Sequence, residues 1–209
     1  PACLRRNFAV SDQFEPGSTF KIFTTAAALE EGIVDAETTF YDQGHLSIGG
    51  INVRCWRPGG HGLQTFQQAL ENSCNTTFAQ LAAEMLGSQR FHRYLSAFGF
   101  GSKLNIDFPG EAEGTLPTPN ALRWGEKARW ATIGFGQGVA VTPLQLLTAT
   151  AAIANQGVLM QPYVVREIRD QDGTVLEKKV PVPVRQVISP VTAQEVTRLL
   201  RSVVANGSG

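Results

Sequence analysis

Neither sign of charge is in excess in this sequence, because 18 lysine and arginine residues balance 18 aspartate and glutamate residues. A nucleic-acid-binding surface normally requires a basic stripe or patch, so the composition disfavours a nucleic acid as partner. The hydrophobic fraction of 43% and the charged fraction of 17% over 209 residues are ordinary for a globular domain. We therefore expect one domain with a sizeable buried core.

Metal-ligating side chains are also scarce. The sequence has three cysteines and three histidines, namely Cys3, Cys55, Cys74, His45, His61 and His92. The cysteine number is odd, and neither residue type shows a known zinc spacing. We therefore expect neither a metal site nor a disulfide framework, and we interpret the cysteines as packing groups. His61 is expected to be exposed, because it lies in the flexible Pro58–Gly62 loop.

A long uninterrupted apolar run is absent too. The longest stretch without a charge, in the region Ile133–Gln161, is broken by glycines, Gln137 and Pro143, so it does not predict a membrane span. We also expect no signal peptide within these residues. The chain opens on Pro1 rather than on methionine, so we expect that residues upstream have been removed.

The apolar periodicity and the turn residues predict a helix-rich chain with two hairpins. Helices are expected at Thr19–Glu31, Phe66–Glu71, 76–86, 88–98, 142–155 and 192–205, and hairpins at Leu46–Val53 and Tyr163–Lys179. Residues 101–128 read as a loop-rich segment, because they contain several prolines.

The first chemical signal is a serine one helical turn before a lysine, at Ser18 and Lys21. A spacing of three places both side chains on one face of the predicted helix. A serine hydroxyl needs a base to become a nucleophile, and a buried lysine with a lowered pKa can be that base. The pattern alone is weak, because serine is also a common helix cap.

The second signal is Ser73-Cys74-Asn75 at the start of another predicted helix. Ser73 could relay a proton from the lysine to a leaving group, and Asn75 could hold the lysine or a substrate amide. Helix capping is again the simpler explanation for each residue alone. Cys74 is interpreted as a packing residue, because no histidine is placed in the sequence to activate it.

Together these segments resemble the class B penicillin-binding proteins. Glu15–Lys21 is similar to the active-site serine segment of that family, and Glu71–Thr76 to its second motif. Further stretches fit the same family, namely Phe98–Gly101, Asp107–Glu111, Gly134–Gly138 and Val141–Gln145. The resemblance covers nearly the whole chain, from about Ala9 to Gly207.

The resemblance implies an α+β fold of the penicillin-binding protein and serine β-lactamase type, with residues 1–209 as a partial transpeptidase domain. The family's third motif, Lys-Thr-Gly, does not occur in the sequence. In relatives that motif lies on a strand of the central sheet, and other strands precede the serine helix. We therefore expect a helix-rich portion of the domain that is incomplete at both ends of this sheet.

The implied activity is peptidoglycan D,D-transpeptidation through an acyl-serine intermediate, with Ser18, Lys21, Ser73 and Asn75 as catalytic residues and no cofactor. The implied partners are D-Ala-D-Ala stem peptides, β-lactams and a cell-wall glycosyltransferase, at the outer face of the cell membrane in division or sporulation. Two alternatives stay open: a non-catalytic β-lactam sensor or degenerate scaffold of the same fold, and a serine β-lactamase.

Two other features give weaker hypotheses. Trp56, Trp124 and Trp130 are interpreted as packing residues, with Trp124 or Trp130 as a possible wall of a substrate groove. Gly134–Gly138 superficially resembles a dinucleotide-binding loop, but it lacks a Gly-x-Gly-x-x-Gly pattern after a strand. The dinucleotide hypothesis is therefore disfavoured.

Overall fold

The computed structural model describes residues 6–120 and 122–207. Its helical segments are α1 (Phe8–Ser11), the 3-10 turn η2 (Gly17–Phe20), α2 (Lys21–Glu30), α3 (Phe66–Glu71), α4 (Asn75–Gln80), the π-helical segment η3 (Leu81–Leu86), α5 (Ser88–Ala97), α6 (Glu126–Ile133), α7 (Pro143–Ala154) and α8 (Pro190–Asn206).

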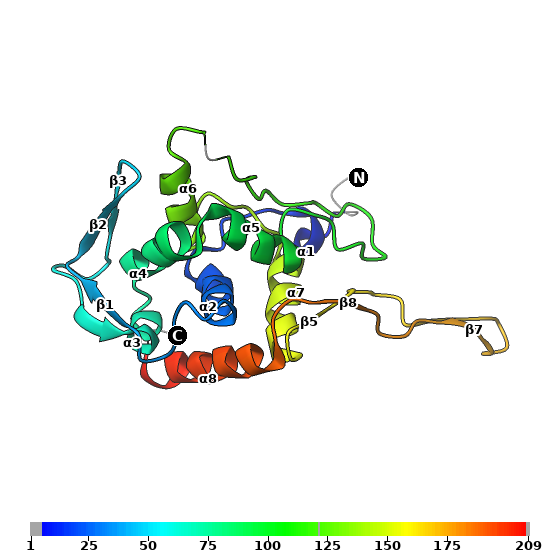
Figure 1. Ribbon diagram of the computed structural model, residues 1–209. Coiled ribbons are helices and arrows are strands. Elements are labelled where there is room, and N and C mark those ends of the chain that lie inside the picture. Colours follow the sequence, from blue (N-terminus) through cyan, green and yellow to red (C-terminus); the bar gives the residue numbers. More distant parts are fainter. Residues whose placement is uncertain (1–5, 121, 208–209) are drawn as a thin grey trace.

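The strands form antiparallel pairs rather than one large sheet. The pairs are β1 (Thr39–Asp42) with β4 (Gly62–Thr65), β2 (His45–Ile48) with β3 (Ile51–Arg54), β5 (Val158–Met160) with β8 (Pro183–Gln186), and β6 (Glu167–Arg169) with β7 (Val175–Lys178). Within the described residues every sheet is two-stranded. The β6–β7 hairpin extends away from the helical body (Figure 1).

Helix α2 lies at the centre of the helical body, and the other helices surround it (Figure 1). It contacts α5, α8 and η3, and most of its side chains are buried. Phe23 packs against Phe98 and Phe100, with ring centroids 5.1 and 4.9 Å apart, and Phe20 lies 5.4 Å from Phe23. This aromatic cluster holds the helix that carries Lys21.

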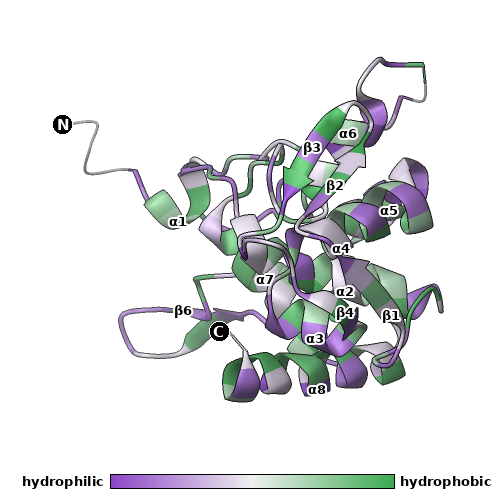
Figure 2. Cartoon of the chain, turned by 90° about the vertical axis from the view of Figure 1, so that its left-hand side faces the viewer, coloured by the Kyte–Doolittle hydropathy of each residue, from purple (hydrophilic) through white to green (hydrophobic). Residues whose placement is uncertain are grey.

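Helix α8 packs its apolar face against α2, α3 and α7. Figure 2 shows apolar and polar residues alternating along it, as expected for a helix with one buried face. Its first turn is held by Ser189, whose backbone N–H and hydroxyl donate to the carboxylate of Glu30 at the end of α2. Among the described helices, none is both long and apolar enough to cross a membrane.

Most of the predicted elements are confirmed. Phe66–Glu71 is a helix with the predicted bounds, and both predicted hairpins form. Helix α7 begins after Thr142 because its side chain accepts a hydrogen bond from the Gln145 backbone, and the Gln145 side chain accepts one from the Thr142 backbone.

Two predictions about helices need correction. Helix α6 begins inside the segment predicted to be loop-rich, because Glu126 accepts a hydrogen bond from the buried Trp130 indole and from the Asn120 backbone. The helix predicted from Thr76 to Leu86 is α4 followed by the π-helical η3, although it ends before Gly87 as expected. Local periodicity does not distinguish these helix types.

Phe23→Ala should lower the free energy of unfolding by about 3–5 kcal/mol, because it leaves a cavity in the aromatic cluster. Urea denaturation followed by circular dichroism measures this. Phe8→Ala is the control, because the Phe8 side chain is 69% exposed and its loss should change stability by under about 0.5 kcal/mol. Equal losses in the two variants would contradict the assignment of Phe23 to the core.

Candidate active site

Ser18 and Lys21 lie on consecutive turns at the start of the central helix. Ser18 is exposed in η2, and Lys21 is the first residue of α2. Gly17 precedes them with a φ of +59°, a conformation that costs an L side chain energy and suits glycine. The Lys21 Nζ lies 3.1 Å from the Ser18 Oγ. The predicted pairing of serine and lysine is therefore present in the fold.

The amino group of Lys21 also reaches the second motif, more than 50 residues farther along the chain. It donates to the backbone carbonyl and the hydroxyl of Ser73, both at 2.7 Å, and to the Asn75 Oδ1 at 2.8 Å. Lys21 is only 2% exposed. An ammonium group has three hydrogens, and these three closer acceptors can take all of them. The Ser18 Oγ is the fourth and most distant neighbour of the amine.

Burial lowers the pKa of Lys21 to about 8, although the nearby thiols of Cys74 and Cys55 oppose the shift. Desolvation disfavours the charged form of an amine. With this pKa, roughly a tenth of the lysines are neutral at pH 7. A neutral amine 3.1 Å from the Ser18 Oγ is placed to accept its proton.

Ser73 connects Lys21 to Ser18 through its hydroxyl. Its hydroxyl donates to the Ser18 Oγ at 3.0 Å. Its backbone has a φ of +50°, which is uncommon for a residue other than glycine and stores strain. This turn aims both the carbonyl and the hydroxyl of Ser73 at Lys21. The structure therefore brings together Ser18, Lys21, Ser73 and Asn75, the four residues selected from the sequence.

The Gly134–Gly138 segment holds the turn that carries Ser18. The Gly17 backbone N–H donates to the Gly136 carbonyl at 3.0 Å, and the Thr24 hydroxyl donates to the Gly134 carbonyl at 2.8 Å. A Cβ at Gly136 would lie 2.1 Å from the Gly17 carbonyl oxygen. No local pattern predicts these contacts, because they join residues 110 and 119 positions apart along the chain.

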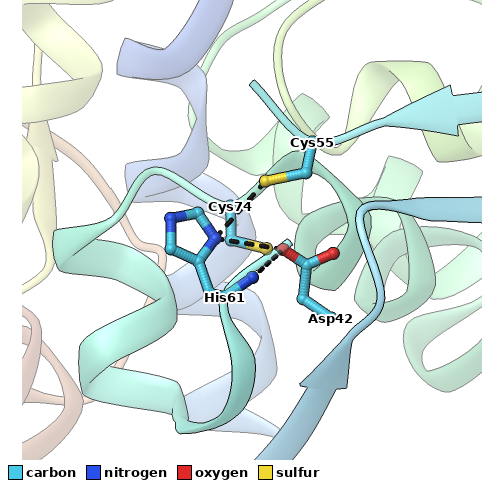
Figure 3. A group of neighbouring side chains, drawn as sticks. All are labelled: Asp42, Cys55, His61 and Cys74. Atoms are coloured by element: carbon cyan, nitrogen blue, oxygen red, sulfur yellow. Dashed lines mark hydrogen bonds and ion pairs between the residues drawn. The ribbon is translucent and has the colours of Figure 1, made fainter. Parts of the chain in front are cut away.

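A second polar cluster lies behind the second motif (Figure 3). It contains Asp42, Cys55, His61 and Cys74. The His61 Nδ1 lies 3.0 Å from the Asp42 Oδ2 and 3.3 Å from the Cys55 Sγ. The predicted exposure of His61 is wrong, since its side chain is only 2% exposed. Cys74 is buried as predicted, but it contacts polar groups rather than the apolar core alone.

The sequence offered a weak signal for this cluster. Asp42 is followed by Gly44, and His61 follows two glycines, so both segments can approach closely as backbones. Successive members of the cluster lie 6 or 13 positions apart in the sequence, which matches no short metal motif. Only the pairing of β1 with β4 brings Asp42 and His61 together.

The tryptophans divide between core and surface. Trp130 is 1% exposed, so its predicted packing role is confirmed. Trp56 and Trp124 are 62% and 96% exposed, and the packing interpretation is wrong for both. The Trp56 indole donates to the Asn72 carbonyl at 2.7 Å, next to the second motif.

Comparison with known proteins gives the class to which this geometry belongs. Residues 4–209 match the penicillin-binding protein transpeptidase domain. The chain therefore belongs to the transpeptidase family of penicillin-binding proteins. Its resemblance to the class B members is confirmed.

Particular relatives place the chain more closely. It is 44% identical to Stage V sporulation protein D of Bacillus subtilis over 100% of the chain and 32% of that protein. It is 37% identical to the peptidoglycan D,D-transpeptidase MrdA of Acinetobacter baumannii over 77% of the chain and 25% of that protein. The chain thus spans about a third or less of the length of these relatives.

Solved structures show the same fold. The D,D-transpeptidase domain of a peptidoglycan glycosyltransferase from Eggerthella lenta superposes with a TM-score of 0.89 at 32% identity, over 97% of this chain and 51% of that chain. Penicillin-binding protein 3 of Mycobacterium tuberculosis in complex with aztreonam gives 0.85 at 32% identity, over 95% of this chain and 43% of that one. The expected fold class is therefore confirmed.

Gly136→Ala should destabilise the protein by more than backbone strain alone, because its new Cβ would overlap the Gly17 backbone. Gly173→Ala is a matched control: Gly173 has a similar φ, +84° against +80°, but nothing lies within 4 Å of its added Cβ. The control should lose roughly 1–2 kcal/mol of unfolding free energy. Chemical denaturation of both variants checks this, and equal losses would contradict the proposed contact.

Proposed function

We propose that this chain is the part of a peptidoglycan D,D-transpeptidase domain that carries the nucleophile and its base. The observation that carries the proposal is the amino group of Lys21, buried within hydrogen-bonding distance of both Ser18 and Ser73. A hydroxyl beside a desolvated amine of lowered pKa is the arrangement that acyl transfer to serine requires. Family membership supports peptidoglycan peptide as the substrate.

In the proposed first step, the Ser18 Oγ attacks the carbonyl of the penultimate D-Ala in a stem peptide. Neutral Lys21 takes the Oγ proton as the new ester bond forms. Ser73, which bridges Lys21 and Ser18, passes a proton to the leaving nitrogen and receives one from Lys21, and the bond to the terminal D-Ala breaks. Asn75 holds the lysine amine in place.

In the second step an amine of a neighbouring stem peptide attacks the acyl-serine. The amine loses a proton to the site, the ester bond breaks, and the Ser18 hydroxyl is restored as the cross-link forms. A β-lactam would enter the first step in the same way and leave an acyl-serine that hydrolyses slowly. Penicillin-binding protein 3 of Mycobacterium tuberculosis, a structural relative at 32% identity, is solved in complex with aztreonam and with ampicillin, which supports β-lactam binding as part of the proposal.

The Lys-Thr-Gly motif does not occur in residues 1–209. The proposed catalytic residues of this chain therefore belong to the first two motifs of the family only. We further propose a location at the outer face of the cell membrane and a cell-wall glycosyltransferase as partner; the relatives that support this are named as a stage V sporulation protein and a peptidoglycan D,D-transpeptidase. Steady turnover of penicillin by the full-length protein would contradict this proposal and indicate a serine β-lactamase.

Ser18→Ala should abolish labelling of the full-length protein by a fluorescent penicillin. Peptide mass spectrometry of the unchanged protein should place the label on Ser18, because its Oγ is the exposed hydroxyl next to Lys21. Ser47→Ala, which changes an exposed serine of β2, is the control and should label normally. Label on any other residue would exclude Ser18 as the nucleophile.

Lys21→Arg should slow acylation by on the order of 10²-fold or more, because a guanidinium keeps its proton near neutral pH. In the unchanged protein the acylation rate should rise with pH through about 8, the pKa of Lys21, because only the neutral amine accepts the serine proton. Stopped-flow labelling between about pH 6 and pH 9.5 measures both. A flat profile, or an arginine variant of normal rate, would rule out Lys21 as the base.

A further inference from the structure

We propose that an open cavity beside α6 binds an internal carboxylate of the peptide substrate through Arg123 and Arg129. The cavity has a volume of about 610 Å³ and is lined by the segment 115–120, by Arg123, by Arg129 of α6 and by Gly138. The chain crosses the top of the view in Figure 1 before it enters α6. Ligand pockets span roughly 300–1,000 Å³, so this arginine cavity can hold part of a peptide.

The charged side chains that line the arginine cavity are all of one sign. Arg123 and Arg129 are its only ionisable lining residues. Neither guanidinium has an ion-pair or hydrogen-bond partner among residues 6–120 and 122–207. By contrast, Lys127 of the same helix pairs with Glu84 at 2.7 Å. Two unpaired cations at one cavity produce a positive potential that favours an anionic ligand group.

The carboxylates on the neighbouring segments have other partners. The Glu15 Oε1 accepts the backbone N–H of Gly138 at 2.8 Å. The Glu126 Oε1 accepts the backbone N–H of Asn120 and the indole N–H of Trp130, both at 2.7 Å. These contacts hold the backbone around the cavity but provide no counter-ion for either arginine.

The walls of the cavity are fixed before a ligand arrives. At one end Thr115 and Ala140 exchange two backbone hydrogen bonds, at 2.7 and 3.0 Å. At the other end Asn120 is tied to the first residue of α6. Between these ends, Pro117 and Pro119 each have a backbone φ fixed by the ring. A site that is already ordered loses little conformational entropy when it binds a ligand.

The cavity also lies next to the turn that carries the proposed nucleophile. Its lining residue Gly138 comes two positions after Gly136, whose carbonyl accepts the backbone N–H of Gly17 at 3.0 Å. Gly17 immediately precedes Ser18. A peptide with its reacting group at Ser18 can therefore place a neighbouring residue in the arginine cavity.

The two arginines select the chemistry of that neighbouring residue. A guanidinium presents its N–H donors as a planar fork that matches the two oxygens of a carboxylate. Both the donor peptide that acylates Ser18 and the acceptor peptide that resolves the acyl-serine can supply such a carboxylate, and kinetics distinguishes the two sources. This inference rests on the proposed function, because it takes peptide as the substrate. Arg123 and Arg129 are therefore proposed as specificity residues and not as catalytic ones.

Binding is tested on full-length Ser18→Ala protein, which cannot form the acyl-serine. The probes are two fluorescent pentapeptides that end in D-Ala-D-Ala and differ only in one internal carboxylate or carboxamide. We expect the carboxylate peptide to bind roughly 10–100-fold more tightly, because hydrogen bonds to charged groups are stronger than neutral ones. The difference should shrink at high salt. Equal affinity for the two peptides would overturn the proposal.

Matched variants locate the site. Arg123→Gln and Arg129→Gln should each reduce the preference for the carboxylate peptide, whereas Arg201→Gln, which changes an exposed arginine of α8 outside the cavity, should keep it. Arg129→Lys should give an intermediate preference, because it retains the charge but loses the fork. Arg123 is exposed, so its substitution does not disturb packing. An unchanged preference in both cavity variants would place the carboxylate elsewhere and overturn the assignment.

The source of the carboxylate is tested with Ser18 intact, by following the consumption of donor peptide and the ratio of cross-linked to hydrolysed product. A lower kcat/KM for the carboxylate donor in the arginine variants, with normal labelling by fluorescent penicillin, identifies the donor. A fall in the product ratio alone identifies the acceptor, and no change in either quantity would overturn a role in the reaction. Selective peptide binding without any labelling of Ser18 by penicillin would instead count against the proposed function.

Discussion

The candidate active site depends on a single buried amine. Lys21 is placed at the start of the central helix, where it loses its hydration and gains three strong acceptors from Ser73 and Asn75. Desolvation disfavours its charge and lowers the pKa to about 8, although the nearby thiols of Cys74 and Cys55 oppose the shift. An amine near the midpoint of its titration can take and return a proton, which a fully exposed lysine does rarely at neutral pH.

That balance requires the two motifs to be held from opposite sides. On one side the Gly134–Gly138 segment binds the turn before Ser18 through backbone hydrogen bonds. On the other side the Ser73 turn adopts a left-handed conformation and presents its carbonyl to the lysine. Strained turns of this kind persist when their surroundings hold them in place. Here the surroundings are the aromatic core under α2 and the polar cluster around Asp42.

The second motif thus has two faces with different tasks. Ser73 and Asn75 contact the lysine, while Cys74 and Thr76 contact the cluster of Asp42, Cys55 and His61. Because the two sets of contacts alternate along the segment, four consecutive positions, Ser73 to Thr76, serve two clusters at once. A displacement of Cys74 therefore moves its sequence neighbours Ser73 and Asn75 directly, and these are the residues that hold the Lys21 amine.

The sequence by itself determined the helix-rich class, the two hairpins and the four residues of the candidate active site. It could do so because helix periodicity, capping boxes such as Thr142 with Gln145, and motif spacing are local properties. The motif patterns were weak one by one, and the resemblance to penicillin-binding proteins implied their catalytic roles; the comparisons confirmed that family.

Only the tertiary structure decided which distant residues share an environment. The burial of His61, the approach of Asp42 to Cys74, and the contact of Gly136 with Gly17 each join segments that lie far apart in the chain. Trp130 of helix α6 is likewise buried by rings from another segment, since Phe91 and His92 of α5 pack against its indole. Burial depends on what packs from outside the local window, and no pattern within that window contains this information.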